Sequence, residues 1–343
     1  MNKTQFSSPK LTIPYHRAGK TVLSALESKG LDTAGIEVIS DVNSKVRTAQ
    51  YVAINDVKKD LVLAMADMSL FATRDHLLSR SGLSPKWSVV DANWSPGVTR
   101  NIMSSARNMK SKVAFEPVSV PKSGRIFEPS SEPFDPRQVV QCFPQHKIDL
   151  ATPNQHELAA MHASAHKYEF FETDRWWQVI DSFGVPSSGA RDRFVALTNR
   201  KMADEGIPLQ TIQLLPYVPT ILTKLGAEGV LLTELLMPDD PRLTDPDTAR
   251  YILCRTSNGS TEIGGVYMRL FPAMKFSGDA VSVNGVGDTF LGILVAGLAK
   301  GSKLDENLIN IAQQGAVMTL QSKDAVSPRL AELAKGLDEL AEA

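Results

Sequence analysis

A glycine-rich turn and an acidic residue stand together in residues 281–290 (VSVNGVGDTF), which run into a long apolar segment. Gly285 and Gly287 bracket the predicted turn, and the apolar segment predicts a buried helix. Such a turn gathers free backbone N–H groups and the positive end of a helix dipole, which together form an anion hole. The amides of Gly285, Val286 and Gly287 would then meet a transferring phosphoryl group, while Asp288 accepts a proton from an alcohol.

The same carboxylate also fits a purely structural role. Aspartate is favoured as a helix N-cap, where it contributes about 1 kcal/mol. The predicted burial of the helix favours the chemical interpretation, because a structural cap rarely needs two glycines that clear the approach to it.

A second polar group follows a predicted strand in residues 148–157 (IDLATPNQHE). Asn154 and Glu157 are three residues apart, so they share one face of a helix. An amide and a carboxylate on that face suit a hydrated Mg²⁺, which takes few protein ligands. The alternative is a capping box, with Asn154 as the N-cap and Glu157 at the third helical position. The position after a strand's carboxyl end keeps the functional interpretation open, because α/β sheets bind ligands there.

The third stretch is residues 220–232 (TILTKLGAEGVLL), two predicted strands joined by a turn that contains Gly226 and Gly229. Glycines in such a turn let a nucleotide approach the backbone closely. An ordinary β-hairpin explains the same pattern.

The elements that must position these residues are short apolar runs alternating with longer helix-like stretches. Several runs are apolar on both faces, which is typical of a mostly parallel sheet covered by helices on both sides. We therefore predict a doubly wound α/β fold. The predicted strands are Trp87–Asp91, Lys112–Glu116, Lys147–Thr152, Thr220–Lys224, Gly229–Thr233, Tyr251–Cys254 and Gly265–Leu270. The predicted helices are Ala18–Lys29, Ser69–Arg80, Val98–Met109, Pro136–Phe143, Asn154–His166, Arg191–Glu205, Asp288–Lys300, Asp305–Gln321 and Pro328–Ala341.

A separate β-hairpin is predicted from Thr48–Ile54 and Leu61–Ala66, which are joined by a polar loop. It precedes the first clear strand–helix–strand unit, so we expect it to stand off the main sheet as a flap.

The composition of the 343 residues is that of an ordinary globular protein, with 43% hydrophobic residues and a formal net charge of -1. This balance gives no global field for nucleic acid or an anionic membrane. Cys142 and Cys254 are too few for a disulfide framework, and no apolar run reaches bilayer length. The expected location is the cytoplasm. The acid-free, basic first 20 residues leave a mitochondrial transit peptide as the alternative.

Taken together and in order, the three stretches resemble the ribokinase/PfkB family of carbohydrate kinases. Residues 284–290 are similar to its C-terminal signature, residues 152–157 to its Asn-x-x-Glu element, and residues 224–229 to its nucleotide turn. The predicted hairpin looks like the family's β-lid. Residues 89–93 (VVDAN) and 115–122 (FEPVSVPK) are closest to the pseudouridine kinase branch.

This resemblance implies an ATP- and Mg²⁺-dependent kinase that phosphorylates a ribose-type hydroxyl, converting pseudouridine to pseudouridine 5'-phosphate. It implies that Asp288 is the catalytic base and that Gly285, Val286 and Gly287 form the anion hole. Asn154 and Glu157 would organise the magnesium ion. The nucleotide site would be formed by Asn154, Lys224, Gly226, Gly229 and Asn284. The lid, at about residues 48–66, would close over the sugar or pair with a second subunit in a homodimer. Because the branch is often fused to a pseudouridine-5'-phosphate glycosidase in eukaryotes, a functional link to that activity is also implied.

Three departures from the family pattern qualify these expectations. Nothing in residues 1–20 matches the family's first strand or its sugar-binding aspartate, so we treat them as an unassigned extension of a kinase domain at 21–343. Lys224 replaces a threonine of the nucleotide turn. Ser282 replaces an aspartate that commonly helps to hold a monovalent cation, which leaves the need for that cation open. A catalytically silent nucleotide-binding or regulatory protein and a kinase for another sugar remain the alternatives.

Two further groups have simpler explanations. His162 and His166 have the i, i+4 spacing of a zinc site, but no third ligand is evident. The aromatic residues between Phe170 and Trp177 are expected to fill the core under the insertion at 167–215.

Overall fold

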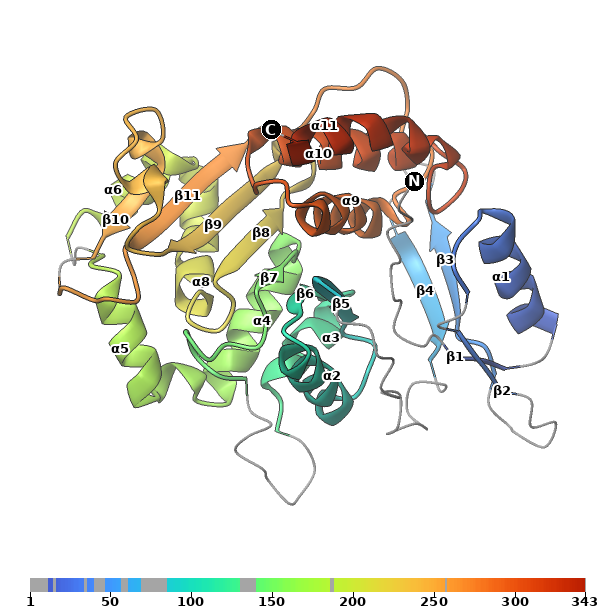
Figure 1. Cartoon of the computed structure of the whole chain (residues 1–343), viewed down its shortest axis with the longest axis horizontal. Helices are drawn as coiled ribbons and strands as arrows, with labels where there is room; N and C mark the ends of the chain where they lie inside the picture. The colour runs from blue at the N-terminus through green and yellow to red at the C-terminus, as the bar shows by residue number, and fades with distance from the viewer. Residues whose placement is uncertain are drawn as a thin grey trace.

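A seven-stranded sheet runs through the molecule in the order β10-β11-β9-β8-β7-β6-β5 (Figure 1). The computed structural model describes residues 12–14, 17–33, 36–39, 47–56, 61–68, 85–129, 140–185, 188–256 and 258–342. The strands of this sheet are β5 (Trp87–Asp91), β6 (Lys112–Glu116), β7 (Leu150–Ala151), β8 (Thr220–Lys224), β9 (Val230–Leu236), β10 (Ile252–Arg255) and β11 (Gly265–Phe271). Neighbouring strands from β5 to β8 pair in parallel, whereas β8–β9, β9–β11 and β11–β10 pair antiparallel. Five of the seven strands, β5 to β8 and β11, therefore run in the same direction, which confirms the prediction of a mostly parallel sheet.

Helices cover both faces of this sheet (Figure 1). They are α2 (Pro96–Asn108), α3 (Val120–Ser123), α4 (Gln155–Lys167), α5 (Asp174–Ser182), α6 (Ala190–Leu197), α7 (Arg200–Asp204), α8 (Ile207–Leu214), α9 (Val286–Lys300), α10 (Glu306–Leu320) and α11 (Ala334–Glu342). Figure 1 shows α9 and α10 on one side of the sheet, and α4 and α8 on the other.

Two hydrophobic cores result, because alternate residues of each strand point to opposite faces. Val113 and Phe115 belong to the core under α2, α4 and α8, whereas Ala114 between them belongs to the core under α9 and α10. In β9, Leu231 and Leu232 divide in the same way. This burial on both faces is the physical basis of the doubly wound fold.

The first part of the chain forms two small sheets beside the main sheet (Figure 1). Strands β3 (Gln50–Asn55) and β4 (Leu61–Asp67) pair antiparallel, which confirms the predicted hairpin. Strands β1 (Thr12–Pro14) and β2 (Glu37–Ile39) pair in parallel and flank helix α1 (Arg17–Ser28). The sequence predicted the helix but neither of these two strands, and the domain boundary drawn at residue 20 falls inside α1.

Other predicted elements need correction. The predicted helix at 136–143 is wrong over its described part, residues 140–143, where the chain is irregular. There the Phe143 N–H donates to Pro216 O at 2.7 Å, and the Phe143 carbonyl accepts from the Arg175 guanidinium, so these groups have partners outside a helix. The predicted helix at 69–80 lies outside the described residues.

One predicted helix is divided, and the short helix α3 and the helices α5 and α8 were missed. The helix predicted at 191–205 is interrupted because Asn199 caps α7, its side chain accepting from the Met202 N–H at 2.9 Å. Helices α5 and α8 lie in the stretch interpreted as an insertion, and Thr173 caps the first of them.

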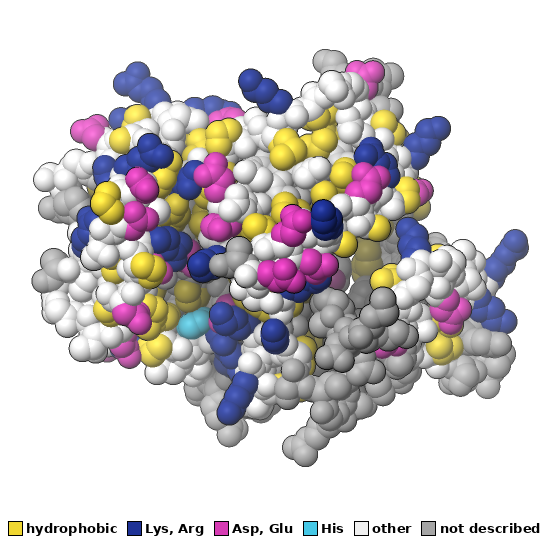
Figure 2. Space-filling model, turned by 45° about the horizontal axis from the view of Figure 1, so that its top comes forward, with side chains coloured by type: hydrophobic (Ala, Val, Ile, Leu, Met, Phe, Trp, Pro, Cys, Tyr) yellow, Lys and Arg dark blue, Asp and Glu magenta, His cyan; other side chains and the backbone are white. Residues whose placement is uncertain are grey.

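The surface agrees with the near-neutral composition. Basic and acidic side chains are interspersed on the face shown in Figure 2. In the described part of the chain, no helix combines the length and the apolar character needed to cross a bilayer.

Candidate active site

The carboxyl ends of three parallel strands bring the polar candidates together. Glu116 ends β6, Thr152 follows β7 and Lys224 ends β8. The Lys224 N–H donates to Pro153 O at 2.8 Å, which extends the pairing of β8 past the end of β7 and sets Asn154 beside Lys224. The candidates from two separate motifs therefore become neighbours at one edge of the sheet.

The predicted capping box is present at the start of α4. Asn154 Oδ1 accepts from the N–H groups of His156 and Glu157, both at 2.9 Å, and Glu157 Oε2 accepts from the Asn154 N–H at 2.8 Å. The Glu157 side chain is buried. Because the box occupies Asn154 Oδ1 and Glu157 Oε2, it leaves Glu157 Oε1 as the carboxylate oxygen not used in capping.

Glu116 joins these elements, although the sequence analysis gave it no role. Thr152 Oγ1 donates to Glu116 Oε2 at 2.7 Å, and Lys224 Nζ lies 3.1 Å from Oε1 and 3.3 Å from Oε2. Burial raises the pKa of the Glu116 carboxyl; the Lys224 charge and the Thr152 hydrogen bond oppose this shift, and the Glu157 charge reinforces it. This buried carboxylate is therefore held at the strand ends by a cation and a hydroxyl.

The glycine turn opens α9 as the sequence predicted. Gly285 is the N-cap, with φ 75°, and a Cβ added there would lie 1.7 Å from Ala325 O, so only glycine fits. The first helical hydrogen bond runs from the Thr289 N–H to Gly285 O at 2.9 Å. Within the described part of the chain, the N–H groups of Val286, Gly287 and Asp288 have no acceptor. The turn therefore presents a cluster of free amides at the positive end of a buried helix.

Asp288 lies at the third position of α9 and is exposed to solvent. The structural alternative, in which Asp288 is the N-cap, is wrong because Gly285 occupies that position. Asn284 is also exposed, and its N–H donates to Ser282 Oγ at 3.2 Å. The carboxylate thus stands beside the free amides without being used to cap the helix.

Lys224 connects this turn to the strand ends. A Cβ added to Gly287 would lie 3.0 Å from Lys224 Nζ, 3.8 Å from Cε and 3.9 Å from Cδ. The Lys224 ammonium therefore lies directly over Gly287, in the space that any other residue would fill. Gly287 does not have a positive φ, so room for Lys224, rather than backbone conformation, favours glycine there.

The two glycines of the nucleotide turn differ in their surroundings. The turn is a 3₁₀ segment, Gly226–Glu228, between β8 and β9, so the predicted hairpin is also present. Gly226 has φ 58° and is exposed, with no atom within 4 Å of an added Cβ. Gly229 is buried, and an added Cβ would lie 2.0 Å from Phe271 O. Gly226 alone leaves an open backbone surface, whereas Gly229 permits close packing.

The two stretches that are closest to the pseudouridine kinase branch also meet. Lys122 Nζ donates to Asn93 Oδ1 at 2.7 Å, and the Asn93 N–H donates to Asp91 Oδ1 at 2.9 Å. Burial lowers the pKa of Lys122, and the Arg125 charge lowers it further, while Asp91 opposes both. Both stretches were recognisable in the sequence, but their contact was not predicted.

His162 and two of the aromatic residues have structural roles. His162 Nε2 forms a hydrogen bond with Gln213 Oε1 at 2.7 Å, and Phe171 and Trp176 are buried in the core, whereas Trp177 is 48% exposed. Among the residues that the structure describes, no group of three or more His, Cys, Asp or Glu side chains is arranged to hold a metal ion.

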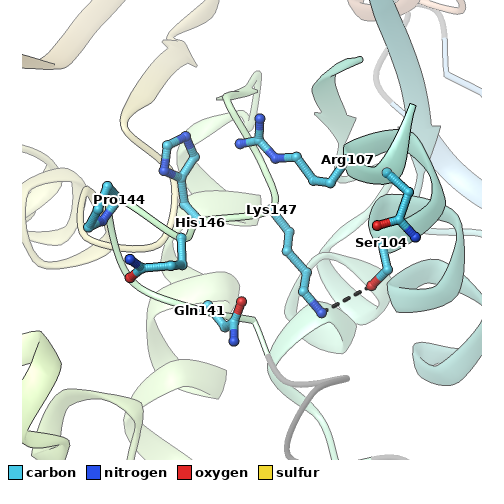
Figure 3. Close-up of a pocket in the computed structure, with 8 residues that line it drawn as sticks. Ser104, Arg107, Gln141, Pro144, His146 and Lys147 are labelled. Atoms are coloured by element: carbon cyan, nitrogen blue, oxygen red, sulfur yellow. Dashed lines mark hydrogen bonds between the residues drawn. The ribbon is translucent and has the colours of Figure 1, made fainter. Parts of the chain in front are cut away.

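A cavity of about 470 Å³ lies near the amino-terminal ends of β6 and β7, where α2 ends and the chain leads into β7 (Figure 3). Its lining is polar and basic, and comprises Ser104, Arg107, Asn108, Gln141, Pro144, Gln145, His146 and Lys147. Lys147 Nζ donates to Ser104 Oγ at 3.0 Å across one side of it (Figure 3). The lining contains none of the candidate catalytic residues.

Asp149 follows this basic segment. Burial alone would raise the pKa of its carboxyl, but hydrogen bonds from His146 and the Val113 N–H, together with the Arg107 charge, hold the pKa below its usual value. The Arg107–Asp149 ion pair measures 3.1 Å between Nη2 and Oδ1. The Asp149 carboxylate is therefore a charged group with a structural role.

The chain is similar to known proteins in sequence and in fold. No protein-family model matches the sequence. A pseudouridine-metabolizing bifunctional protein of Schizosaccharomyces pombe is 31% identical over 298 residues, which are 85% of this chain and 36% of that protein. The chain thus spans about a third of the length of this curated relative.

Solved structures of sugar and nucleoside kinases share the fold. A ribokinase of Cryptococcus neoformans var. grubii, in complex with ADP, has a TM-score of 0.58 and 16% identity, over 95% of this chain and 81% of that one. A nucleoside kinase of Burkholderia thailandensis, in complex with inosine, has a TM-score of 0.54 and 11% identity, over 96% and 78%. The chain therefore has the ribokinase-like fold.

Proposed function

We propose that the chain is an ATP-dependent kinase that phosphorylates a ribose-type hydroxyl, with pseudouridine as the acceptor and pseudouridine 5'-phosphate as the product. The observation that carries this proposal is the cluster of free amides at the start of α9, with the Lys224 ammonium over it and the Asp288 carboxylate beside it. Phosphoryl transfer needs mainly such positioning and stabilisation of negative charge. The sequence similarity to the Schizosaccharomyces pombe protein supports pseudouridine as the acceptor.

In the proposed reaction, Asp288 accepts the proton of the 5'-hydroxyl as the hydroxyl oxygen attacks the γ-phosphorus of ATP. The bond between that phosphorus and the bridging oxygen breaks, and ADP leaves with the electron pair. The amides of Val286, Gly287 and Asp288, together with the Lys224 ammonium, stabilise the phosphoryl oxygens. The open face of Gly226 receives the nucleotide.

A magnesium ion fits this site only through few direct contacts. Both Glu116 oxygens are bonded to Thr152 or Lys224, and Glu157 Oε2 is bonded to a backbone N–H. Glu157 Oε1 remains for the ion or for its water ligands, which suits the retained hydration shell of Mg²⁺. A bound Mg²⁺ would neutralise charge on the nucleotide phosphates.

The hairpin of β3 and β4 supports a second part of the proposal, the pairing of two copies through the lid. Val52 pairs with Met65 and Ile54 with Leu63 across the strands, and all four side chains are about half exposed. An apolar face of this kind is unfavourable in water. We therefore propose that the same face of a second copy covers it.

The acceptor is tested by measuring ADP release with pseudouridine, uridine, ribose and adenosine, and by locating the phosphate on the product by NMR. The expected result is the highest kcat/KM with pseudouridine and a phosphate on its 5'-oxygen. Faster turnover of another acceptor would replace pseudouridine with that sugar.

Exposure of Asp288 favours one alternative, a protein that binds the nucleotide without transferring its phosphate, because an open site does not exclude water. Calorimetry with ADP and with pseudouridine distinguishes the two. Binding of ADP without binding of any nucleoside would support the alternative.

A further inference from the structure

The Lys224 side chain contacts two groups that come from different parts of the fold. One is the Glu116 carboxylate at the end of β6, 108 residues earlier in the chain, and the other is Gly287 in the first turn of α9, where an added Cβ would lie 3.0 Å from Nζ. The ammonium is thus fixed between a strand end and the cluster of free amides.

Glu116 is itself held in place. Its side chain is only 9% exposed, Thr152 Oγ1 donates to Oε2, and the Val118 N–H lies 3.4 Å from Oε1. A lysine side chain has many rotamers and places a charge accurately only when a partner restricts them. The rigid carboxylate supplies that restriction.

A buried ion pair of this kind is weak evidence for a stabilising role. Burial raises the pKa of Glu116, which shows that the surroundings disfavour its charged form. The energy lost by removing two charges from water commonly offsets the attraction within a buried pair. The pair is therefore better explained by the position that it gives to Lys224, whose side chain lies beside the unpaired amides and is 18% exposed.

We infer that Glu116 is a positioning residue, which holds the Lys224 ammonium over Gly287 so that this fixed cation and the amides of α9 form one binding group for the transferring phosphoryl. The inference rests on the proposed kinase function. It assigns to Glu116 an effect that passes through Lys224, as distinct from a direct contact with a metal ion near Glu157.

A double-mutant cycle tests this dependence, with kcat and the KM for ATP measured for Glu116→Gln, Lys224→Met and the double variant. Removal of one stabilising donor typically lowers kcat by about 100-fold or more, so we expect a loss of that order for Lys224→Met. We expect about a tenfold loss of kcat for Glu116→Gln alone, because the cation remains but is misplaced. In the Lys224→Met background, Glu116→Gln should have no further effect.

Two results would overturn the inference. One is a double variant whose loss equals the product of the two single losses, as expected if Glu116 acts on a metal ion independently. The other is a Glu116→Gln enzyme with the kcat of the wild type. Thr152→Val, which removes only the hydroxyl bonded to Glu116, should give a smaller loss with the same dependence on Lys224, and serves if Glu116→Gln does not fold.

Failure of the proposed function has a different signature. If the wild-type chain binds ADP by calorimetry but phosphorylates none of the nucleosides, the kinase proposal fails and the cycle is measured on ADP affinity. In that assay Glu116→Gln should again have no further effect in the Lys224→Met background. Independent effects of the two substitutions on ADP affinity would contradict the role of Glu116.

Discussion

Replacement of Gly287 by alanine separates the chemistry from the fold. The added methyl group would lie 3.0 Å from Lys224 Nζ, a contact that the flexible end of the lysine relieves by moving away. Gly287 has no positive φ, so alanine is compatible with the helix there, and we expect the free energy of unfolding to stay within about 1 kcal/mol of the wild type.

The expected loss of activity follows from the displaced ammonium. A hydrogen bond to a charged group contributes about 1.5–3 kcal/mol, and about 1.4 kcal/mol corresponds to a tenfold change in rate. We therefore expect Gly287→Ala to lower the kcat/KM for ATP by about 10- to 100-fold, as measured by coupled ADP release.

Gly292→Ala is the matched control, because Gly292 lies in the same helix and has no atom within 4 Å of an added Cβ. The control should keep full activity. Wild-type activity in Gly287→Ala, or an equal loss in both variants, would refute the assignment of Lys224 to the phosphate site.

Three further predictions test the fold and the assembly. Gly285→Ala should destabilise the protein by more than about 2 kcal/mol in urea unfolding, because the added Cβ would overlap a backbone carbonyl. Gly301→Ala, also at positive φ but in open space, should cost about 1 kcal/mol. Equal costs for the two variants would contradict the clash at Gly285. Folding lowers the pKa of Asp149, so the contribution of this residue to stability is full above its unfolded-state pKa of about 4 and is lost as the pH falls through its folded-state pKa. Asp149→Asn should therefore flatten the dependence of the unfolding free energy on pH over that acid range. An unchanged pH profile would count against the lowered pKa. Ile54→Lys, on the apolar face of the hairpin, should convert a dimer to a monomer in light scattering. Tyr51→Lys, three residues away in the same strand and therefore on the opposite face, should not. A wild-type monomer would exclude the lid dimer.

The central strands were predictable because burial on both faces leaves a strong local signal. Lys112–Glu116 and Thr220–Lys224 have the predicted bounds, since each is an apolar run bounded by polar residues. The helix at 207–214 was not predicted; the structure places Pro208 in its first turn, where the missing N–H of proline costs nothing.

The site was predictable only where its residues are close in the sequence. The capping box of Asn154 and Glu157 and the turn at Gly285 are local patterns, and both are present. The role of Glu116 depends on partners 36 and 108 residues away, which come together only when β6, β7 and β8 align their carboxyl ends. The motif at 115–122 contains Glu116, but no local pattern could have identified these partners.

The most direct test of the account is phosphoryl transfer by an Asp288→Asn variant. Wild-type protein should release ADP only when pseudouridine is present. The variant should bind ADP with unchanged affinity by calorimetry, but its kcat should fall by about 10²- to 10⁴-fold, as expected when a general base is lost. Pseudouridine-dependent turnover at the wild-type rate in Asp288→Asn would contradict the assignment of Asp288 as the base.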